Sequence, residues 1–261
     1  MGYLDNQIGY PNDILASRAI IKKDNYAIIP PNGVVCNIIP GFTDCNMTIL
    51  STPKLGASFV DYIGTLFNEG GNLAGFGGGK IECIIYVIEG ELIAYSDKDE
   101  HKLTQGGYLY CPAGVTMRFK NNNKGNPSKI FLYKRIYEPT EGHKAHVVCG
   151  NVNELPKIDY EGMHNVHLQD LLPKDLGFDM NIHILTFQPG ASHGYIETHY
   201  QEHGALILSG KGMYNLDNDW VPVKKGDYIF MASYALQAGY AVGDEEFSYI
   251  YSKDCNRDIE L

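Results

Sequence analysis

Apolar residues along this chain come in short runs that alternate with polar positions or break at glycine. Typical runs are "CIIYVIEGELIAY" (83–95), "ALILSGKGMYNL" (205–216), "GDYIFMAS" (226–233) and "FSYIYSKD" (247–254). A period of two indicates a strand with one buried face, and glycine between two runs indicates a tight turn. Long runs with helical spacing are scarce. The pattern predicts an all-β protein built from many short strands, as in a β-sandwich or barrel.

The same landmarks occur twice at a constant separation of 120 residues. The matching positions are Pro53 and Pro173, Lys54 and Lys174, Gly70 and Gly190, Gly90 and Gly210, and Gly106 and Gly226. One offset that holds through several landmarks indicates a tandem duplication, because independent segments would not keep register. We therefore predict two similar β units in one chain.

The domain boundaries follow from this repeat and from a change in composition. Residues 138–170 include a polar segment punctuated by glycine and proline, which is typical of a linker. We expect an N-terminal arm with the first strands over 1–50, a first unit over 51–137 and a second unit over 171–261.

Composition and charge exclude several classes of function. The 261 residues carry a formal net charge of -10 and no cluster of lysine or arginine, which argues against nucleic-acid binding. No window approaches eighteen apolar residues, so no transmembrane helix is predicted. The N-terminus lacks the pattern of a signal peptide, and the six cysteines form no C-x-x-C pair. These features favour a cytoplasmic protein with reduced thiols.

The stretch "HGYIETHYQEHG" concentrates side chains that can bind a metal. On a strand, residues two apart share a face, so Glu197 and His199 are expected to project together, and His203 can join them. Gln237 follows in another strand-and-turn unit. Four convergent nitrogen and oxygen donors make a divalent metal site plausible, but their spacing does not choose among Mn, Fe, Ni and Zn.

Two other interpretations of this stretch compete with the metal site. His199 to His203 spell H-x-x-E-H, the inverted zincin motif, which needs a helix to bring both histidines to one face. Gly194 and Gly204 flank the motif and "ALILSG" continues as a strand, so a helix is disfavoured. The residues could also be polar groups on a solvated strand face. The second motif, with Gln237, favours the metal site over both.

The two motifs resemble those of the cupin superfamily, G-x5-H-x-H-x3-4-E-x6-G and G-x5-P-x-G-x2-H-x3-N. Here Glu197 stands at the first His, His199 keeps the second, His203 replaces the Glu and Gln237 replaces the His of the second motif. The resemblance implies a bicupin, two tandem jelly-roll-like barrels with the metal set Glu, His, His and Gln in the second.

With that ligand set, the chain resembles the ureidoglycine aminohydrolase family of bicupins. The resemblance runs through "NIIPGF", "STPKLGASFVDY", "SHGYIETH", "KKGDYIFM" and the tail "YIYSKDCNRD". It implies Mn²⁺ as cofactor and hydrolysis of (S)-ureidoglycine to (S)-ureidoglycolate and ammonia in allantoin degradation. It also implies that Glu197, Gln237, Tyr249 and Lys253 contact the small-molecule substrate, with Glu197 and Lys253 catalytic. Bicupins commonly associate, so a homo-oligomer is expected.

The first copy provides an internal comparison. At the offset of 120, the four ligand positions fall on Gly77, Gly79, Cys83 and Met117. None of these is a ligand of the same type, so we expect the first unit to act as scaffold, with Cys83 and Met117 buried.

Several other polar residues are interpreted as bystanders. His193 lies two positions outside the motif, and Glu202 alternates away from His199 and His203 on a strand. We expect neither to serve the site. The histidines of the linker region, at 143, 146, 164 and 167, are expected at the surface.

Other functions remain open on the sequence alone. A different cupin enzyme, such as a metal-dependent isomerase or dioxygenase, would use a related site, but dioxygenases typically bind iron with more histidines. A storage or ligand-sensing bicupin would need no catalytic residues. Donors kept in one unit and absent from the other argue against storage, and no helix-turn-helix pattern supports sensing.

Overall fold

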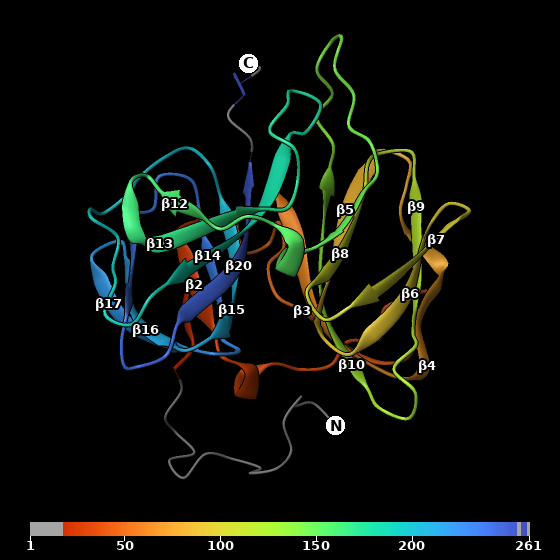
Figure 1. Cartoon of the computed structure of the whole chain (residues 1–261), viewed down its shortest axis with the longest axis horizontal. Coiled ribbons are helices and arrows are strands. Elements are labelled where there is room, and N and C mark those ends of the chain that lie inside the picture. Colours follow the sequence, from red (N-terminus) through yellow and green to blue (C-terminus); the bar gives the residue numbers. More distant parts are fainter. Residues whose placement is uncertain (1–17, 255–256, 260–261) are drawn as a thin grey trace.

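The chain folds into two β barrels that lie side by side (Figure 1). The computed structural model describes residues 18–254 and 257–259. The first barrel is a nine-stranded sheet in the order β11-β8-β5-β10-β4-β9-β6-β7, with β3 paired to β4. Its strands are β3 (Phe42–Ile49), β4 (Phe59–Gly77), β5 (Ile81–Glu89), β6 (Glu91–Ser96), β7 (Asp99–Thr104), β8 (Gly107–Cys111), β9 (Thr116–Asn121), β10 (Ser128–Ile136) and β11 (Val148–Asn151).

The second barrel combines an eight-stranded sheet, β1-β2-β18-β15-β20-β14-β13-β12, with a three-stranded sheet, β17-β16-β19. Its strands from the second half of the chain are β12 (Ile158–Tyr160), β13 (Met163–Asp170), β14 (Met180–Phe187), β15 (His203–Ser209), β16 (Lys211–Leu216), β17 (Asp219–Lys224), β18 (Tyr228–Met231), β19 (Gln237–Ala241) and β20 (Phe247–Asp254). The predicted all-β bicupin architecture is confirmed.

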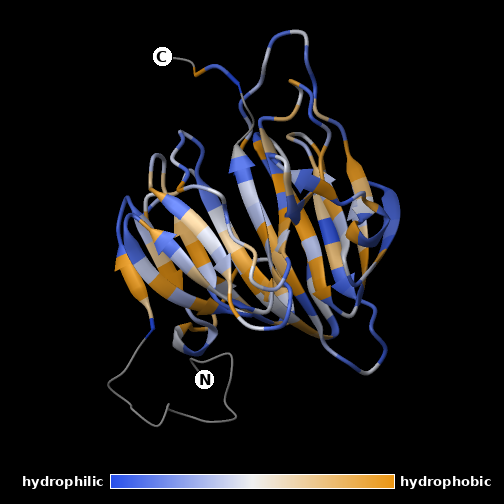
Figure 2. Cartoon of the chain, turned by 60° about the vertical axis from the view of Figure 1, so that its left-hand side comes forward, coloured by the Kyte–Doolittle hydropathy of each residue, from blue (hydrophilic) through white to orange (hydrophobic). Residues whose placement is uncertain are grey.

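The duplication is visible in the strands themselves. β6 and β16 begin and end 120 residues apart, as do β7 and β17. The pairings also match, because β5 lies between β8 and β10 as β15 lies between β18 and β20. Along the strands of both barrels, hydrophobic and hydrophilic positions alternate (Figure 2).

Two segments outside the predicted units over 51–137 and 171–261 join the barrels. The arm at 1–50 carries β1 (Ile20–Lys22) and β2 (Tyr26–Ile29), and β2 pairs with β18 of the second barrel. The segment at 138–170, expected as a linker, gives β11 to the first barrel and β12 and β13 to the second. Both segments therefore tie the two units together through strand pairing.

Apolar side chains fill each barrel and also the surface between the barrels. Phe59 and Tyr133 of the first barrel stack with ring centroids 5.2 Å apart, and Phe230 of the second packs against Phe59 at 6.2 Å. All three rings are almost fully buried. The barrels thus share one continuous apolar contact, which fixes the second barrel against the first.

The two copies differ most after their first long strand. β4 continues to Gly77 and pairs with β9. The corresponding chain after β14 leaves the sheet and contacts β19 only at isolated bridges, among them Glu197 with Gln237. β14 ends at Phe187, and Pro189, two residues further on, cannot donate a ladder hydrogen bond. The expectation that Glu197 and His199 lie on a strand is therefore wrong; they lie on an irregular segment.

Helices and disulfides contribute little to the described part of the chain. Its helical turns are η1 (Pro31–Gly33) and η2 (Val152–Glu154). No helix within 18–254 or 257–259 is long and apolar enough to cross a membrane. The described cysteines, at 36, 45, 83, 111 and 149, are all free thiols, and Cys255 lies outside the described residues.

Candidate metal centre and active site

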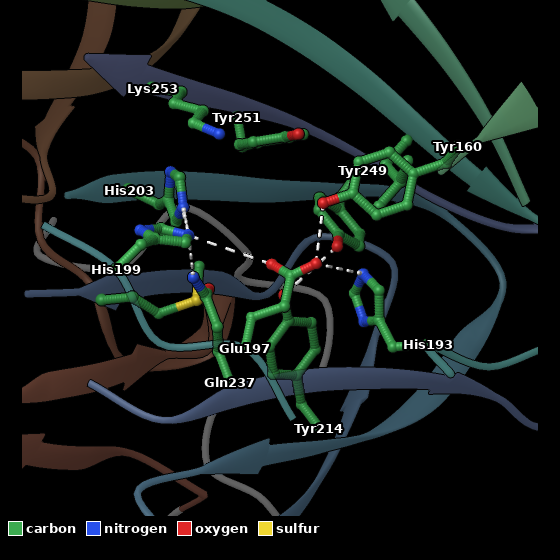
Figure 3. Close-up of a pocket in the computed structure, with 12 residues that line it drawn as sticks. Tyr160, His193, Glu197, His199, His203, Tyr214, Gln237, Tyr249, Tyr251 and Lys253 are labelled. Atoms are coloured by element: carbon green, nitrogen blue, oxygen red, sulfur yellow. Dashed lines mark hydrogen bonds and ion pairs between the residues drawn. The ribbon is translucent and has the colours of Figure 1, made fainter. Parts of the chain in front are cut away.

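The four predicted ligand residues meet inside the second barrel (Figure 3). His203 begins β15 and Gln237 begins β19, while Glu197 and His199 come from the irregular segment. Nε2 of His199 lies 3.2 Å from Nε2 of His203, 2.9 Å from Nε2 of Gln237 and 3.9 Å from Oε2 of Glu197. The polar ends of the four side chains therefore point at one small volume.

Backbone carbonyls fix the tautomers of both imidazoles. Nδ1 of His203 lies 2.7 Å from the carbonyl oxygen of Ser252, and Nδ1 of His199 lies 3.1 Å from that of Gln201. A carbonyl only accepts, so each Nδ1 carries the hydrogen and each Nε2 presents a lone pair. Metal-binding histidines are commonly oriented in this way.

The electrostatics of the two imidazoles favour a bound cation. Burial lowers the pKa of His199 and lowers that of His203 well below its ordinary value, so both rings are neutral at pH 7. Two lone pairs that face each other across 3.2 Å repel unless a positive group lies between them. The donors present therefore fit a divalent metal ion.

The side chains of Glu197 and Gln237 are less closely arranged for metal binding than the two imidazoles. Among the described residues, no three His, Cys, Asp or Glu side chains already stand as a closed coordination group. Oε2 of Glu197 is the most distant donor, and the Gln237 amide must turn by 180° to present its oxygen instead of its nitrogen. Two imidazoles with carboxylate and amide oxygens suit a borderline-to-hard divalent ion.

Two side chains outside the predicted ligand set approach the carboxylate of Glu197. The hydroxyl of Tyr160 donates to Oε1 of Glu197 at 2.7 Å, and Nε2 of His193 lies 3.9 Å from the same oxygen. Tyr160 belongs to β12, in the segment expected as a linker, and no motif marked it. His193, expected to be a bystander, is buried in the pocket wall; that expectation is wrong.

The tail of the chain forms the opposite wall of the pocket. Tyr249, Tyr251 and Lys253 alternate along β20, so they share one face of the strand, and all three line the pocket. Tyr214 donates a hydrogen bond to the Tyr249 hydroxyl at 3.2 Å. Burial raises the pKa of Tyr214, Tyr249 and Tyr251, so these phenols stay neutral and offer hydrogen-bond donors.

The space beside the metal position is small, but a larger cavity adjoins it. The pocket itself holds about 20 Å³, enough for one water molecule. A neighbouring cavity of about 490 Å³ shares Tyr160, Tyr251 and Lys253 with the pocket. These three side chains therefore stand between the metal position and the larger cavity.

The remaining polar residues of the motif region lie outside the site. Oε2 of Glu202 accepts hydrogen bonds from the backbone N–H and the hydroxyl of Ser58, at 2.8 and 3.1 Å, so it ties the second barrel to the first. His143, His146 and His164 are exposed, and His167 is half-buried. In the first barrel, Cys83 and Met117 are buried as expected.

Comparisons with known proteins agree with this architecture. The family model of the cupin domain matches residues 183–252. The curated (S)-ureidoglycine aminohydrolase of Escherichia coli is 63% identical over 262 residues and covers 100% of both chains. The enzyme of that name from Arabidopsis thaliana is 31% identical over 92% of this chain and 79% of its own length.

A solved structure extends the likeness to three dimensions. The crystal structure of protein Ylba from E. coli superposes with a TM-score of 0.87 at 60% identity, covering 97% of this chain and 100% of that one. Because the identity to the curated E. coli relative extends over the full length, the chain belongs to the (S)-ureidoglycine aminohydrolase family of cupin proteins.

Proposed function

We propose that this chain is a manganese-dependent hydrolase that converts (S)-ureidoglycine and water to (S)-ureidoglycolate and ammonia. The observation that carries the proposal is the pair of neutral imidazoles, His199 and His203, whose Nε2 lone pairs meet beside Glu197 and Gln237. Membership of the family supports the substrate. The choice of Mn²⁺ rests on the resemblance to that family, and the donor set is compatible with it.

The reaction replaces one substituent on the α-carbon of the substrate. The bond from that carbon to the amino nitrogen breaks, a water oxygen takes its place, and the nitrogen leaves as ammonia after gaining a proton. A bound Mn²⁺ supplies Lewis-acid polarisation and a fixed orientation for the substrate's carboxylate and amine. The protein must in addition hold the anionic substrate and control the proton on the leaving nitrogen.

The residues of the pocket divide these tasks. The Lys253 ammonium supplies positive charge for the substrate carboxylate in a protein of net charge -10. The neutral hydroxyl of Tyr249 and the amide of Gln237 offer hydrogen bonds to its polar groups. Glu197 faces the metal position with Oε2, and in this proposal it also contacts the substrate amine. We assign proton handling to Glu197 and Lys253 jointly.

The adjacent cavity provides the route for the substrate. At about 20 Å³ the inner pocket is too small for ureidoglycine, while the neighbouring cavity of about 490 Å³ is large enough. Substrate entry therefore requires the shared side chains Tyr160, Tyr251 and Lys253 to move apart, or the substrate to bridge both spaces. The homo-oligomer expected for a bicupin stays a prediction.

The test uses freshly generated (S)-ureidoglycine, because this aminal-like substrate decays on its own. The chain is reconstituted with Mn²⁺, and ammonia release and the chirality of the ureidoglycolate are followed. We expect a rate far above spontaneous decay and the (S) product. A rate equal to that of the buffer, with Mn²⁺ bound, would rule out the assignment.

A further inference from the structure

We propose that Tyr160 is a positioning residue that orients the carboxylate of Glu197, so that the segment between the barrels completes the metal site of the second barrel. The inference deepens the proposed function, on which it rests. Tyr160 lies on the edge strand β12, 37 positions before Glu197 in the sequence. No sequence motif connects the two residues.

The first support is that the two carboxylate oxygens of Glu197 face different partners. Oε1 accepts a hydrogen bond from the Tyr160 hydroxyl at 2.7 Å, while Oε2 points toward Nε2 of His199 at 3.9 Å. Figure 3 shows the two oxygens facing these opposite partners. A carboxylate on a flexible side chain needs such a tie, because rotation about its last bond would exchange the two oxygens. Tyr160 therefore sets which oxygen meets the metal.

The second support is the fixed tautomer of His193. The backbone N–H of Gly239 donates to Nδ1 of His193 at 2.7 Å, and the N–H of His193 donates to the carbonyl oxygen of Gly239 at 3.0 Å. Since Nδ1 accepts, the ring hydrogen of neutral His193 is on Nε2, 3.9 Å from Oε1 of Glu197. Two donors thus face the same carboxylate oxygen.

Packing keeps these two donors in place. The rings of Tyr160 and His193 meet edge to face with centroids 5.8 Å apart, and the Phe187 ring packs against His193 with centroids 5.0 Å apart. The first barrel has nothing comparable, because Leu73 and Gly77 stand at the positions of His193 and Glu197. The arrangement therefore accompanies the metal site and is absent from the general framework of the barrel.

The test is Tyr160→Phe in the full chain, which removes one hydroxyl and keeps the ring. The affinity for Mn²⁺ is measured without substrate, by competition with a chelator, together with kcat and KM and the unfolding temperature of the metal-free protein. We expect Mn²⁺ binding to weaken about 10- to 100-fold. We also expect the fold-decrease in kcat to exceed the fold-change in KM. The unfolding temperature of the metal-free variant should equal that of the metal-free wild type.

Tyr195→Phe is the matched control variant. Tyr195 lies two residues before Glu197 on the irregular segment, and its side chain is half exposed and outside the pocket. It should bind Mn²⁺ as the wild type does. In a Glu197→Ala background, Tyr160→Phe should have no further effect on Mn²⁺ affinity, because no carboxylate remains to be oriented.

The outcomes separate this inference from the proposed function. Wild-type Mn²⁺ affinity and kcat in Tyr160→Phe would overturn the positioning role while leaving the hydrolase assignment intact. An undiminished effect of Tyr160→Phe in the Glu197→Ala background would also overturn it. Weaker Mn²⁺ binding in a chain that does not hydrolyse ureidoglycine would support the positioning role and reject the substrate.

Discussion

The two barrels share one framework and differ in what occupies their centres. In the first, β4 extends to Gly77 and pairs with β9 across a register shift between Asn72 and Phe76, and Cys83 and Met117 are buried. In the second, the chain leaves the sheet after Phe187, and the released segment carries Glu197 and His199 into the barrel. The candidate site thus lies where the second barrel lacks the strand pairing of the first and where the residue types of the two copies differ.

The first barrel could not hold the same ligands without rebuilding. A Cβ at Gly77 would lie 2.6 Å from Sγ of Cys83, closer than packed atoms approach, and its φ of +75° lies in the left-handed region that favours glycine. Both the backbone conformation and the close packing of Cys83 therefore favour glycine at position 77. The comparison teaches that the missing ligands and the continuous strand belong together.

The largest effect is expected when the second barrel receives the residues of the first. His203→Cys with Gln237→Met replaces a nitrogen and an oxygen donor with soft sulfur groups, which suit Mn²⁺ poorly and which the first barrel buries. We expect Mn²⁺ affinity to fall by more than about 100-fold, beyond the loss typical of outer-sphere partners. The Mn²⁺ content that remains after dialysis measures the loss of affinity. The metal-free variant should be as stable as the metal-free wild type, or slightly more stable.

The reciprocal exchange checks the comparison from the other side. Cys83→His with Met117→Gln should create no metal site, because Gly77 and Gly79 supply no donor. Each new polar group would be buried without a partner, at a cost of about 1–3 kcal/mol in the free energy of unfolding measured with urea. Mn²⁺ bound by a second site in this variant would show that residue type alone makes the site.

A smaller effect is expected where the barrels touch next to a ligand. Gly204 follows His203, and a Cβ there would lie 2.0 Å from Oδ2 of Asp61 and 2.4 Å from the hydroxyl oxygen of Tyr228. Gly204→Ala should therefore cost about 1–3 kcal/mol in the free energy of unfolding through overpacking. It should also weaken Mn²⁺ binding, because the strain falls on the residue beside a ligand.

Gly33→Ala is the comparison variant for this prediction. Gly33 has no positive φ, and a Cβ there would meet nothing within 4 Å. Its urea midpoint should match the wild type. A wild-type urea midpoint for Gly204→Ala would contradict the prediction that a Cβ at this position overpacks the contact between the barrels.

A last prediction concerns pH at the same contact between the barrels. Burial raises the pKa of Asp61 to about 8, and Tyr228 donates a hydrogen bond to its Oδ2. Between about pH 4 and pH 8 the folded chain keeps a proton that the unfolded chain loses, so stability falls as the pH rises. Asp61→Asn removes this titration, and the decline in unfolding temperature from pH 5 to pH 8 should become shallower.

Asp99→Asn provides the reference for that measurement, since Asp99 is exposed at the start of β7. It should leave the pH dependence of the wild type unaltered. An identical decline in Asp61→Asn and Asp99→Asn would contradict the raised pKa of Asp61.

Much of this organisation could be predicted from residue patterns. Alternating apolar positions predicted the strands, the offset of 120 predicted the duplication, and the spacing of Glu197, His199 and His203 predicted the cluster that the structure brings together with Gln237. The local geometry was predicted less well. Alternation predicted a strand at Glu197 and His199, but β14 ends at Phe187, shortly before Pro189, and the chain beyond makes only isolated bridges to β19.

The sequence by itself determined the strand-rich fold, its two copies and the donor types, because side-chain alternation and a repeat are local properties of the chain. Only the tertiary structure decided that β2 pairs with β18 and that Tyr160 and His193 face one oxygen of Glu197. The physical reason is that these contacts depend on how strands distant in sequence pair and how each barrel closes, and periodicity carries no information on either.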